Sequence, residues 1–167
     1  MASPQRARRV MASTADRAAV AELLGREPQG AFEIVVRSTS GGPVVIANAP
    51  LLDDGRPMPT RYWLVDPELC RAVGRLEADG GVRRAEAEVD PDLLAAAHAR
   101  YAAERDARIP DDHSGPRPFG GVGGTRIGVK CLHTHLAYTL AGGDDPVGQW
   151  VQARLAETDD PTTGGPT

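Results

Sequence analysis

Residues 32–47 read FEIVVRSTSGGPVVIA, and they contain two short runs rich in β-branched side chains, at 32–37 and 43–47. Serine, threonine and glycine separate the two runs. β-branched runs bounded by such turn residues are typical of strands, so this stretch predicts a β-hairpin with a loose turn. A third strand is expected at 61–65, after a loop at 48–60 that three prolines make stiff.

Helical signals surround the predicted strands. Residues 14–24 predict a helix with Thr14 or Asp16 as its cap and Gly25 as its end. Asp-Pro pairs beginning at positions 66, 90 and 145 predict three more helices, because aspartate favours the N-cap and proline favours the first turn. A fifth helix is expected from Val129, where apolar residues recur at spacings of three and four. The sequence therefore predicts an α+β fold, with a small sheet of about three strands packed with about five helices in a single domain.

Composition narrows the class of protein. Of the 167 residues, 41% are hydrophobic and 25% are charged, which is typical of a globular domain. We expect one domain at 14–157, with disordered tails at 1–13 and 158–167. The net charge of −4 and the scattered arginines disfavour nucleic acid as a partner. With no run of 18 apolar residues and two cysteines 61 positions apart, we expect no membrane segment, no disulfide framework and a cytoplasmic location.

Lys130 is the single lysine in a chain with 18 arginines, and it follows a glycine-rich run at 120–128. A loop without β-carbons that leads into a helix N-terminus can bind an anion through free backbone amides. We therefore expect a phosphorylated or otherwise anionic small molecule here. The expected contacts are Gly121, Gly123, Gly124, Thr125, Arg126 and Lys130. The run matches neither a Walker A loop nor a dinucleotide fingerprint, and a flexible connector is the alternative.

The segment Cys131-Leu132-His133-Thr134-His135 carries the candidate acid or base and the candidate metal ligands. On a strand its three polar side chains would share one face and could bind zinc, whereas on a helix they would not. Because the apolar spacing favours a helix, no three-ligand site is expected within the segment. A Cys131/His135 pair completed by ligands from elsewhere remains the metal alternative. His133 is the candidate acid or base, and Lys130 is expected to lower its pKa; the alternative is a buried histidine bonded to a carbonyl.

Two further groups are candidates for function. Asp53 and Asp54 lie in the stiff loop and are expected to position a water or a magnesium ion, while the alternative is a simple turn. His98, Tyr101 and Arg105 share one face of a predicted helix. That face would either line a cleft or form an ordinary helix side, with the tyrosine packed and the arginine paired to an acid.

Taken together, these segments resemble a bacterial family catalogued as Domain of Unknown Function 501. The resemblance covers roughly residues 17–151 and rests on the stretches 48–64, 75–81, 129–133, 140–143 and 145–146. Its distinctive pieces are Asp-Gly-x-Pro-x-Pro-Thr at 54–60 and Val-Lys-Cys-Leu-His at 129–133. The chain departs from the pattern at Asp66, where relatives can have cysteine, and at Tyr138, where they can have histidine. If those positions bind a metal in relatives, this chain lacks the corresponding cysteine and histidine ligands.

The resemblance implies a gene neighbourhood with a septum-formation coiled-coil protein and an exopolyphosphatase. Some members carry the label "septum formation initiator", which does not suit a chain without a heptad run or a transmembrane segment. From the residues and the resemblance we expect an anion-binding protein in which hydrolase or transferase activity would use His133, Asp53 and Asp54. The alternative is a non-catalytic scaffold that binds a protein partner. The sequence does not decide whether the chain is an enzyme, and it names no cofactor beyond magnesium as a candidate.

Overall fold

The computed structural model describes residues 11–159 and confirms the predicted α+β class. The described elements are α1 (Thr14–Leu24), β1 (Phe32–Arg37), β2 (Pro43–Asn48), β3 (Tyr62–Leu64), α2 (Pro67–Ala78), α3 (Gly81–Glu88), α4 (Pro91–Asp106), the 3-10 turn η1 (Val122–Gly124), α5 (Leu132–Leu140) and α6 (Pro146–Asp159). The tails predicted at 1–13 and 158–167 lie largely outside the described residues; Ser13 caps α1 and Thr158 belongs to α6. None of the helices at 11–159 is long and apolar enough to cross a membrane.

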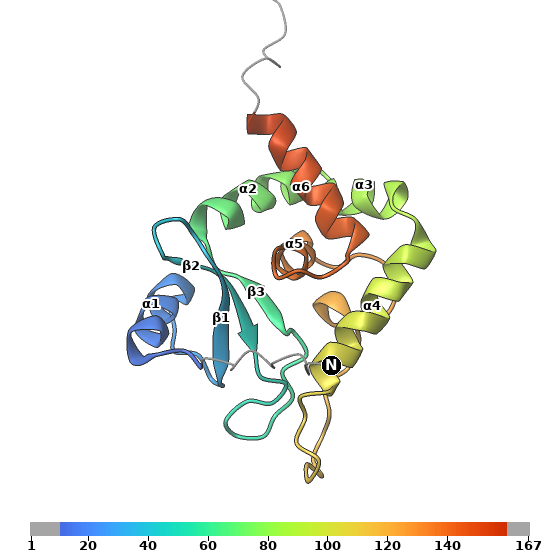
Figure 1. Cartoon of the computed structure of the whole chain (residues 1–167). Helices are drawn as coiled ribbons and strands as arrows, with labels where there is room; N and C mark the ends of the chain where they lie inside the picture. The colour runs from blue at the N-terminus through green and yellow to red at the C-terminus, as the bar shows by residue number, and fades with distance from the viewer. Residues whose placement is uncertain (1–10, 160–167) are drawn as a thin grey trace, which may run out of the picture.

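The sheet is antiparallel, with β2 in its centre and the order β1-β2-β3. Side chains of β2 alternate between the two faces, so that Val45 and Ala47 belong to one hydrophobic cluster and Ile46 to the other. Helix α1 covers the Ile46 face and α5 covers the opposite face (Figure 1). The predicted hairpin is confirmed, with irregularities in the register between Ile34 and Val36 and between Val36 and Arg37.

Aspartate-proline pairs begin three helices, as the sequence predicts. The carboxylate of Asp66 accepts a hydrogen bond from the Leu69 amide at 2.9 Å, and that of Asp90 accepts one from the Asp92 amide at 2.8 Å. The third pair begins α6 in the same way. Each such cap contributes about 1 kcal/mol by satisfying amides that have no partner within the helix. For α1 the cap is Ser13, and neither Thr14 nor Asp16 takes that position.

Helix α3 and the start of α5 differ from the sequence prediction. Gly80 ends α2 with a left-handed backbone (φ 81°), but Gly81 then begins a further helix that has no side-chain cap. A β-carbon on Gly81 would lie only 2.5 Å from the carbonyl oxygen of Leu76, so this close turn requires glycine. Helix α5 begins at Leu132 instead of Val129, because Cys131 is extended (φ −152°, ψ 126°). Val129 packs against the core from outside the helix and so continues the apolar spacing.

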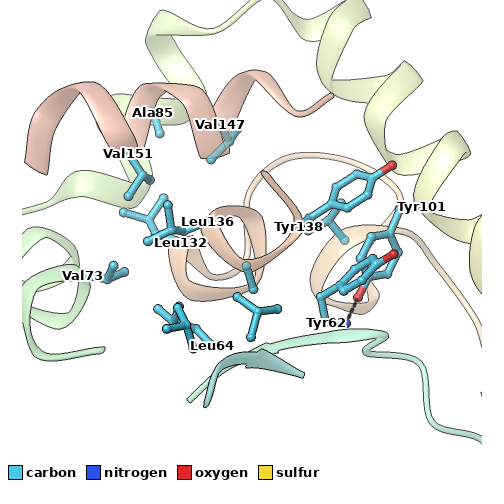
Figure 2. Packing of buried hydrophobic residues seen from close by; sticks show 14 of the residues in the cluster. Tyr62, Leu64, Val73, Ala85, Tyr101, Leu132, Leu136, Tyr138, Val147 and Val151 are labelled. Atoms are coloured by element: carbon cyan, nitrogen blue, oxygen red, sulfur yellow. Dashed lines mark hydrogen bonds between the residues drawn. The ribbon is translucent and has the colours of Figure 1, made fainter. Parts of the chain in front are cut away.

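Three tyrosines join α4, α5 and the sheet. Tyr62 of β3 stacks on Tyr138 of α5 with ring centroids 5.6 Å apart, and Tyr101 of α4 meets Tyr138 edge-on at 5.1 Å (Figure 2). The Tyr101 hydroxyl accepts hydrogen bonds from the amides of Arg61 and Tyr62 at 2.6 and 3.2 Å. Burial raises the pKa of Tyr101 to about 12, so the hydroxyl stays neutral and anchors α4 to the start of β3.

His135 and Asp145 form a buried pair between α5 and the start of α6. Both side chains are 0% exposed, and His135 Nδ1 lies 2.6 Å from a carboxylate oxygen of Asp145. The other oxygen of Asp145 accepts hydrogen bonds from the amides of Val147 and Gly148, at 2.9 and 3.3 Å. A buried carboxylate is tolerated only when it is fully bonded, and here it has three partners. The pair thus fixes how α6 crosses α5.

His98 of α4 fixes the glycine loop, which we define as residues 120–128. Its Nδ1 accepts the Val122 amide at 3.0 Å, and its Nε2 lies 2.9 Å from the Gly128 carbonyl oxygen. Because a carbonyl can only accept, Nε2 carries the proton and the ring is neutral. The pKa of His98 lies below its ordinary value, mainly because the ring is buried. The Gly128 carbonyl and Asp145 raise this pKa and His135 lowers it, but burial has the largest effect. Protonation of Nδ1 would place its N–H against the N–H of Val122, so that contact would be lost.

Replacing the buried carboxylate should destabilise the fold. We expect Asp145→Ala to lower the free energy of unfolding by about 3–5 kcal/mol, because it leaves His135 and the α6 amides without a partner in the interior. Urea unfolding measures this. The matched control is Asp144→Ala, since the Asp144 side chain is 78% exposed and should contribute less than about 1 kcal/mol. Equal losses in the two variants would contradict the role of the pair.

The pKa of His98 predicts a dependence of stability on pH. A folded pKa below the unfolded value of about 6.5 means that the unfolded chain binds more protons in acid, so the free energy of unfolding should fall as the pH drops below about 6.5. Urea unfolding at a series of pH values should show a smaller fall for His98→Gln than for the unsubstituted chain. His113→Gln is the control and should behave like the unsubstituted chain. A fall unaltered by His98→Gln would refute the assignment.

Candidate functional site

A cavity of about 340 Å³ lies between α4 and the segment that leads into the glycine loop. We call it the arginine pocket. Its polar and aromatic lining consists of His98, Arg105, Asp106, Phe119 and Arg126, and the backbone of Gly120 and Gly121 completes the wall. A β-carbon on Gly121 would lie 2.6 Å from that of His98, so glycine is what allows the loop to approach α4 this closely.

Arg105 is the buried cation of the arginine pocket. Its side chain is 1% exposed, and its Nε binds the Asp106 carboxylate at 2.8 Å. The Nη1 atom donates to the carbonyl oxygens of Pro59 and Gly120, at 3.1 and 2.8 Å. Arg105 therefore holds the proline-braced loop and the glycine loop against α4, and places a fixed guanidinium in the pocket wall. The sequence left two alternatives for this helix face, a cleft lining or an ordinary side with the arginine paired to an acid. Features of both are present, since Arg105 pairs with Asp106 and also lines a cavity.

Arg126 is the exposed cation of the same pocket. Its guanidinium lies 4.0 Å from the ring centroid of Phe119, close enough for a cation–π contact. A second cavity of about 270 Å³ shares Arg126 and His98 with the first and extends to Gly128. Arg126 therefore borders two neighbouring cavities.

Most of the other groups predicted to contact an anion form hydrogen bonds within the glycine loop instead. The Gly121 amide donates to the Thr125 carbonyl and the Gly124 amide to the Gly121 carbonyl. The Thr125 hydroxyl donates to the Ile127 carbonyl at 2.8 Å. Gly123 and Lys130 lie side by side, but Lys130 is exposed, lines neither cavity and forms no side-chain hydrogen bond or ion pair with residues 11–159.

The start of α5 lies against the end of α2. The first amide of the helix, that of Leu132, donates to Glu77 Oε1 at 2.7 Å. The same oxygen lies 3.1 Å from His133 Nδ1, and that nitrogen lies 3.6 Å from Cys131 Sγ. We call Glu77, Cys131 and His133 the thiol cluster. A carboxylate thus occupies the helix N-terminus where a bound anion was expected.

The pKa values within the thiol cluster oppose the sequence prediction. The hydrogen bond with Cys131, together with the Cys70 carbonyl and the charge of Glu77, outweighs burial and raises the pKa of His133 to about 9. The prediction that Lys130 would lower this pKa is wrong, because Glu77 and Cys131 are the groups that the ring faces. Burial opposes ionisation of the Cys131 thiol, but hydrogen bonds from His133 and the Thr134 amide outweigh it and lower its pKa. The lowered pKa makes the thiolate form of Cys131 more accessible than that of an ordinary cysteine.

The remaining predicted residues lie elsewhere. His135 faces Asp145 in the interior, and among the described residues the metal-capable group at Cys131 contains His133 and Glu77 instead. Asp53 and Asp54 are exposed in the loop before β3, whereas the thiol cluster follows β3 in the chain. Asp54 is held by Arg56, whose Nε lies 2.7 Å from its carboxylate. Neither aspartate lines the arginine pocket.

Glu77 is the functional candidate that the sequence analysis missed. It lies in the last turn of α2, and no local motif distinguishes it from the other glutamates. Its segment, 75–81, carries part of the family resemblance, and that was the available signal. Its contact with His133 spans 56 positions, so only the packing of α2 on α5 reveals it.

Comparisons with known proteins give one match. The sequence model of a family described as "Protein of unknown function (DUF501)" matches residues 34–153, which cover most of the chain and contain the arginine pocket and the thiol cluster. The searches of curated proteins and of solved structures found no match. The match agrees with the resemblance inferred from the motifs at 54–60 and 129–133. The chain therefore belongs to the DUF501 family.

Proposed function

We propose that the protein binds a phosphorylated or otherwise anionic small molecule in the arginine pocket. The observation that carries the proposal is the presence of two guanidinium groups, Arg105 and Arg126, in the lining of one cavity of about 340 Å³. This volume lies within the range of about 300–1,000 Å³ that is typical of small-molecule sites. Guanidinium groups bind phosphate and carboxylate through paired N–H donors, which gives orientation as well as charge.

The charges of the pocket support an anion as the ligand. The acid in the lining, Asp106, is already paired with Arg105, and His98 is held neutral by its two backbone contacts. Arg126 has no acidic partner among the described residues and retains its charge for a ligand. Arg105 is fixed in the pocket wall by burial and three carbonyl contacts, and Asp106 balances its charge. Affinity should therefore depend most on Arg126.

The proposal concerns binding first. His133, Asp53 and Asp54 line neither cavity that Arg126 borders, so hydrolase or transferase activity with magnesium would need a substrate that reaches beyond the arginine pocket. We also propose a location in the bacterial cytoplasm. The two cysteines, Cys70 and Cys131, are unpaired in the structure, which agrees with a reducing compartment.

A non-catalytic scaffold that binds a protein partner is the second candidate function. It is supported by two apolar side chains in and beside the glycine loop, since Ile127 is 88% exposed and Phe119 is 58% exposed. Large apolar side chains that are exposed to solvent can serve as protein contacts. The two candidates predict different outcomes in a ligand screen.

A thermal-shift screen with inorganic phosphate, nucleotides and polyphosphate tests the anion proposal. At a concentration of about 100 times its dissociation constant, a ligand that binds the native state should add about 2.7 kcal/mol to the free energy of unfolding. We expect such a shift for a phosphate-bearing compound, and we expect Arg126→Gln to remove most of it.

Arg117→Gln is the matched control, because Arg117 is exposed in the same loop region but does not line the arginine pocket. It should leave the shift unchanged, as should Lys130→Gln. Absence of a shift with every anion would refute the proposal and favour the scaffold. A shift abolished equally by Arg117→Gln would mean unspecific attraction of anions to the surface.

A further inference from the structure

We propose that Glu77, Cys131 and His133 form a binding site for one divalent transition-metal ion, with Zn²⁺ as the ion that the ligand set fits best. The three residues offer a carboxylate oxygen, a sulfur and an imidazole nitrogen that all lie within 4.8 Å of one another. This site is independent of the arginine pocket, with which it shares no residue.

The distances within the thiol cluster agree with tetrahedral coordination. Zinc binds sulfur at about 2.3 Å and nitrogen or oxygen at about 2.0–2.1 Å, so at a tetrahedral angle the sulfur and nitrogen ligands should lie about 3.6 Å apart and nitrogen and oxygen about 3.3 Å apart. Cys131 Sγ and His133 Nδ1 are 3.6 Å apart, and His133 Nδ1 and Glu77 Oε1 are 3.1 Å apart. Two of the three ligand separations therefore already match tetrahedral coordination, and the third, between Cys131 Sγ and a Glu77 carboxylate oxygen, is within 4.8 Å.

The backbone explains how residues two apart in sequence can share one ion. Cys131 is the extended residue that precedes α5, and His133 lies in the first turn of the helix. Had the helix begun at Val129, the two side chains would have diverged by the helical rotation of about 100° per residue. The late start of α5 thus brings together ligands that a continuous helix would separate.

Outer hydrogen bonds hold two of the ligands in place. His133 Nε2 lies 3.0 Å from the Cys70 carbonyl oxygen, so the ring donates there and directs Nδ1 toward Cys131 and Glu77. Glu77 accepts the Leu132 amide at 2.7 Å. A metal-binding histidine almost always donates its other ring nitrogen to a carbonyl, a carboxylate or water, and such contacts fix the ring orientation.

Metal binding would exchange protons for the ion. Zinc takes a thiolate and a ring nitrogen with a free lone pair, so any protons held at Cys131 Sγ and His133 Nδ1 would leave to solvent as the ion binds.

The ligand types select the metal, and the exposure predicts an open coordination position. A thiolate with an imidazole favours zinc and its neighbours over magnesium and calcium, which prefer oxygen ligands. The side chains of His133 and Glu77 are 29% and 28% exposed, so water can reach the ion. Three protein ligands and a water are typical of zinc sites that act on a substrate, whereas structural sites have four protein ligands.

Cys70 provides a matched control within the same region. Its thiol donates to the Leu64 carbonyl at 3.3 Å and is not part of the metal-capable group, although its own carbonyl orients His133. Substitution of Cys70 by serine retains a donor for Leu64 and leaves the backbone carbonyl in place. Cys70→Ser and Cys131→Ser therefore each remove one sulfur atom, but only Cys131→Ser removes a proposed ligand.

The test is Co²⁺ and Zn²⁺ binding to the full chain, purified without a histidine tag and stripped with a chelator. We expect one ion per chain and, with Co²⁺, thiolate-to-cobalt charge-transfer absorption together with the intense visible bands of a tetrahedral ion. Cys131→Ser should abolish the charge-transfer band. It should also weaken Zn²⁺ binding by at least about 100-fold in competition with a chromophoric chelator, since even outer contacts are worth about 10–100-fold.

Cys70→Ser should retain both the band and the affinity. Glu77→Gln should retain the band with weaker binding, because glutamine still accepts the Leu132 amide but lacks the charge. Circular dichroism in chelator should match the unsubstituted chain for each variant, and each variant should still unfold cooperatively, so that lost binding is not lost folding. The proposal is overturned by absence of the band in the unsubstituted chain, by its persistence in Cys131→Ser, or by its loss in Cys70→Ser.

Discussion

The buried pair of His135 and Asp145 is the interaction on which the arrangement of the candidate sites depends. The carboxylate has no solvent to stabilise it, so its three hydrogen bonds fix α5 and the start of α6 in one register. The His135 ring also meets His98 edge-on at 5.8 Å, and His98 holds the glycine loop. This buried pair thus connects α5, which contributes His133 to the thiol cluster, to the loop that lines the arginine pocket.

Those parts of the fold with local signals could be predicted from the sequence. Asp66, Asp90 and Asp145 predict the helices that follow them, because a capping carboxylate accepts a hydrogen bond from an amide two or three residues further on. The hairpin could be predicted from β-branched runs on either side of a turn. Helix α3 could not be predicted in this way, because it begins at Gly81 without a side-chain cap and depends on packing beside α2. The start of α5 was misplaced because Val129 packs on the core from a non-helical backbone.

The sequence also located the chemically distinctive segment, 120–135, but not the residues that it faces. Glu77, His98 and Arg105 come from α2 and α4, and their contacts with this segment depend on tertiary packing. The predicted direction of the His133 pKa shift was wrong because it considered Lys130, a neighbour in sequence, and not the hydrogen bond with Cys131 or the charge of Glu77, a neighbour in space. The structure divides the segment, so that the glycine loop faces α4 while Cys131 and His133 face α2. One stretch of sequence thereby supplies two sites of different chemistry.

That division is tested most directly by nuclear magnetic resonance of the ¹⁵N-labelled full chain, titrated separately with inorganic phosphate and with Zn²⁺. We expect two separate sets of shifted amides, with phosphate affecting Gly120, Gly121 and Arg126, and zinc affecting Glu77 and residues 131–133. If both ligands shifted the same amides, or if neither set responded, the division into two sites would be contradicted.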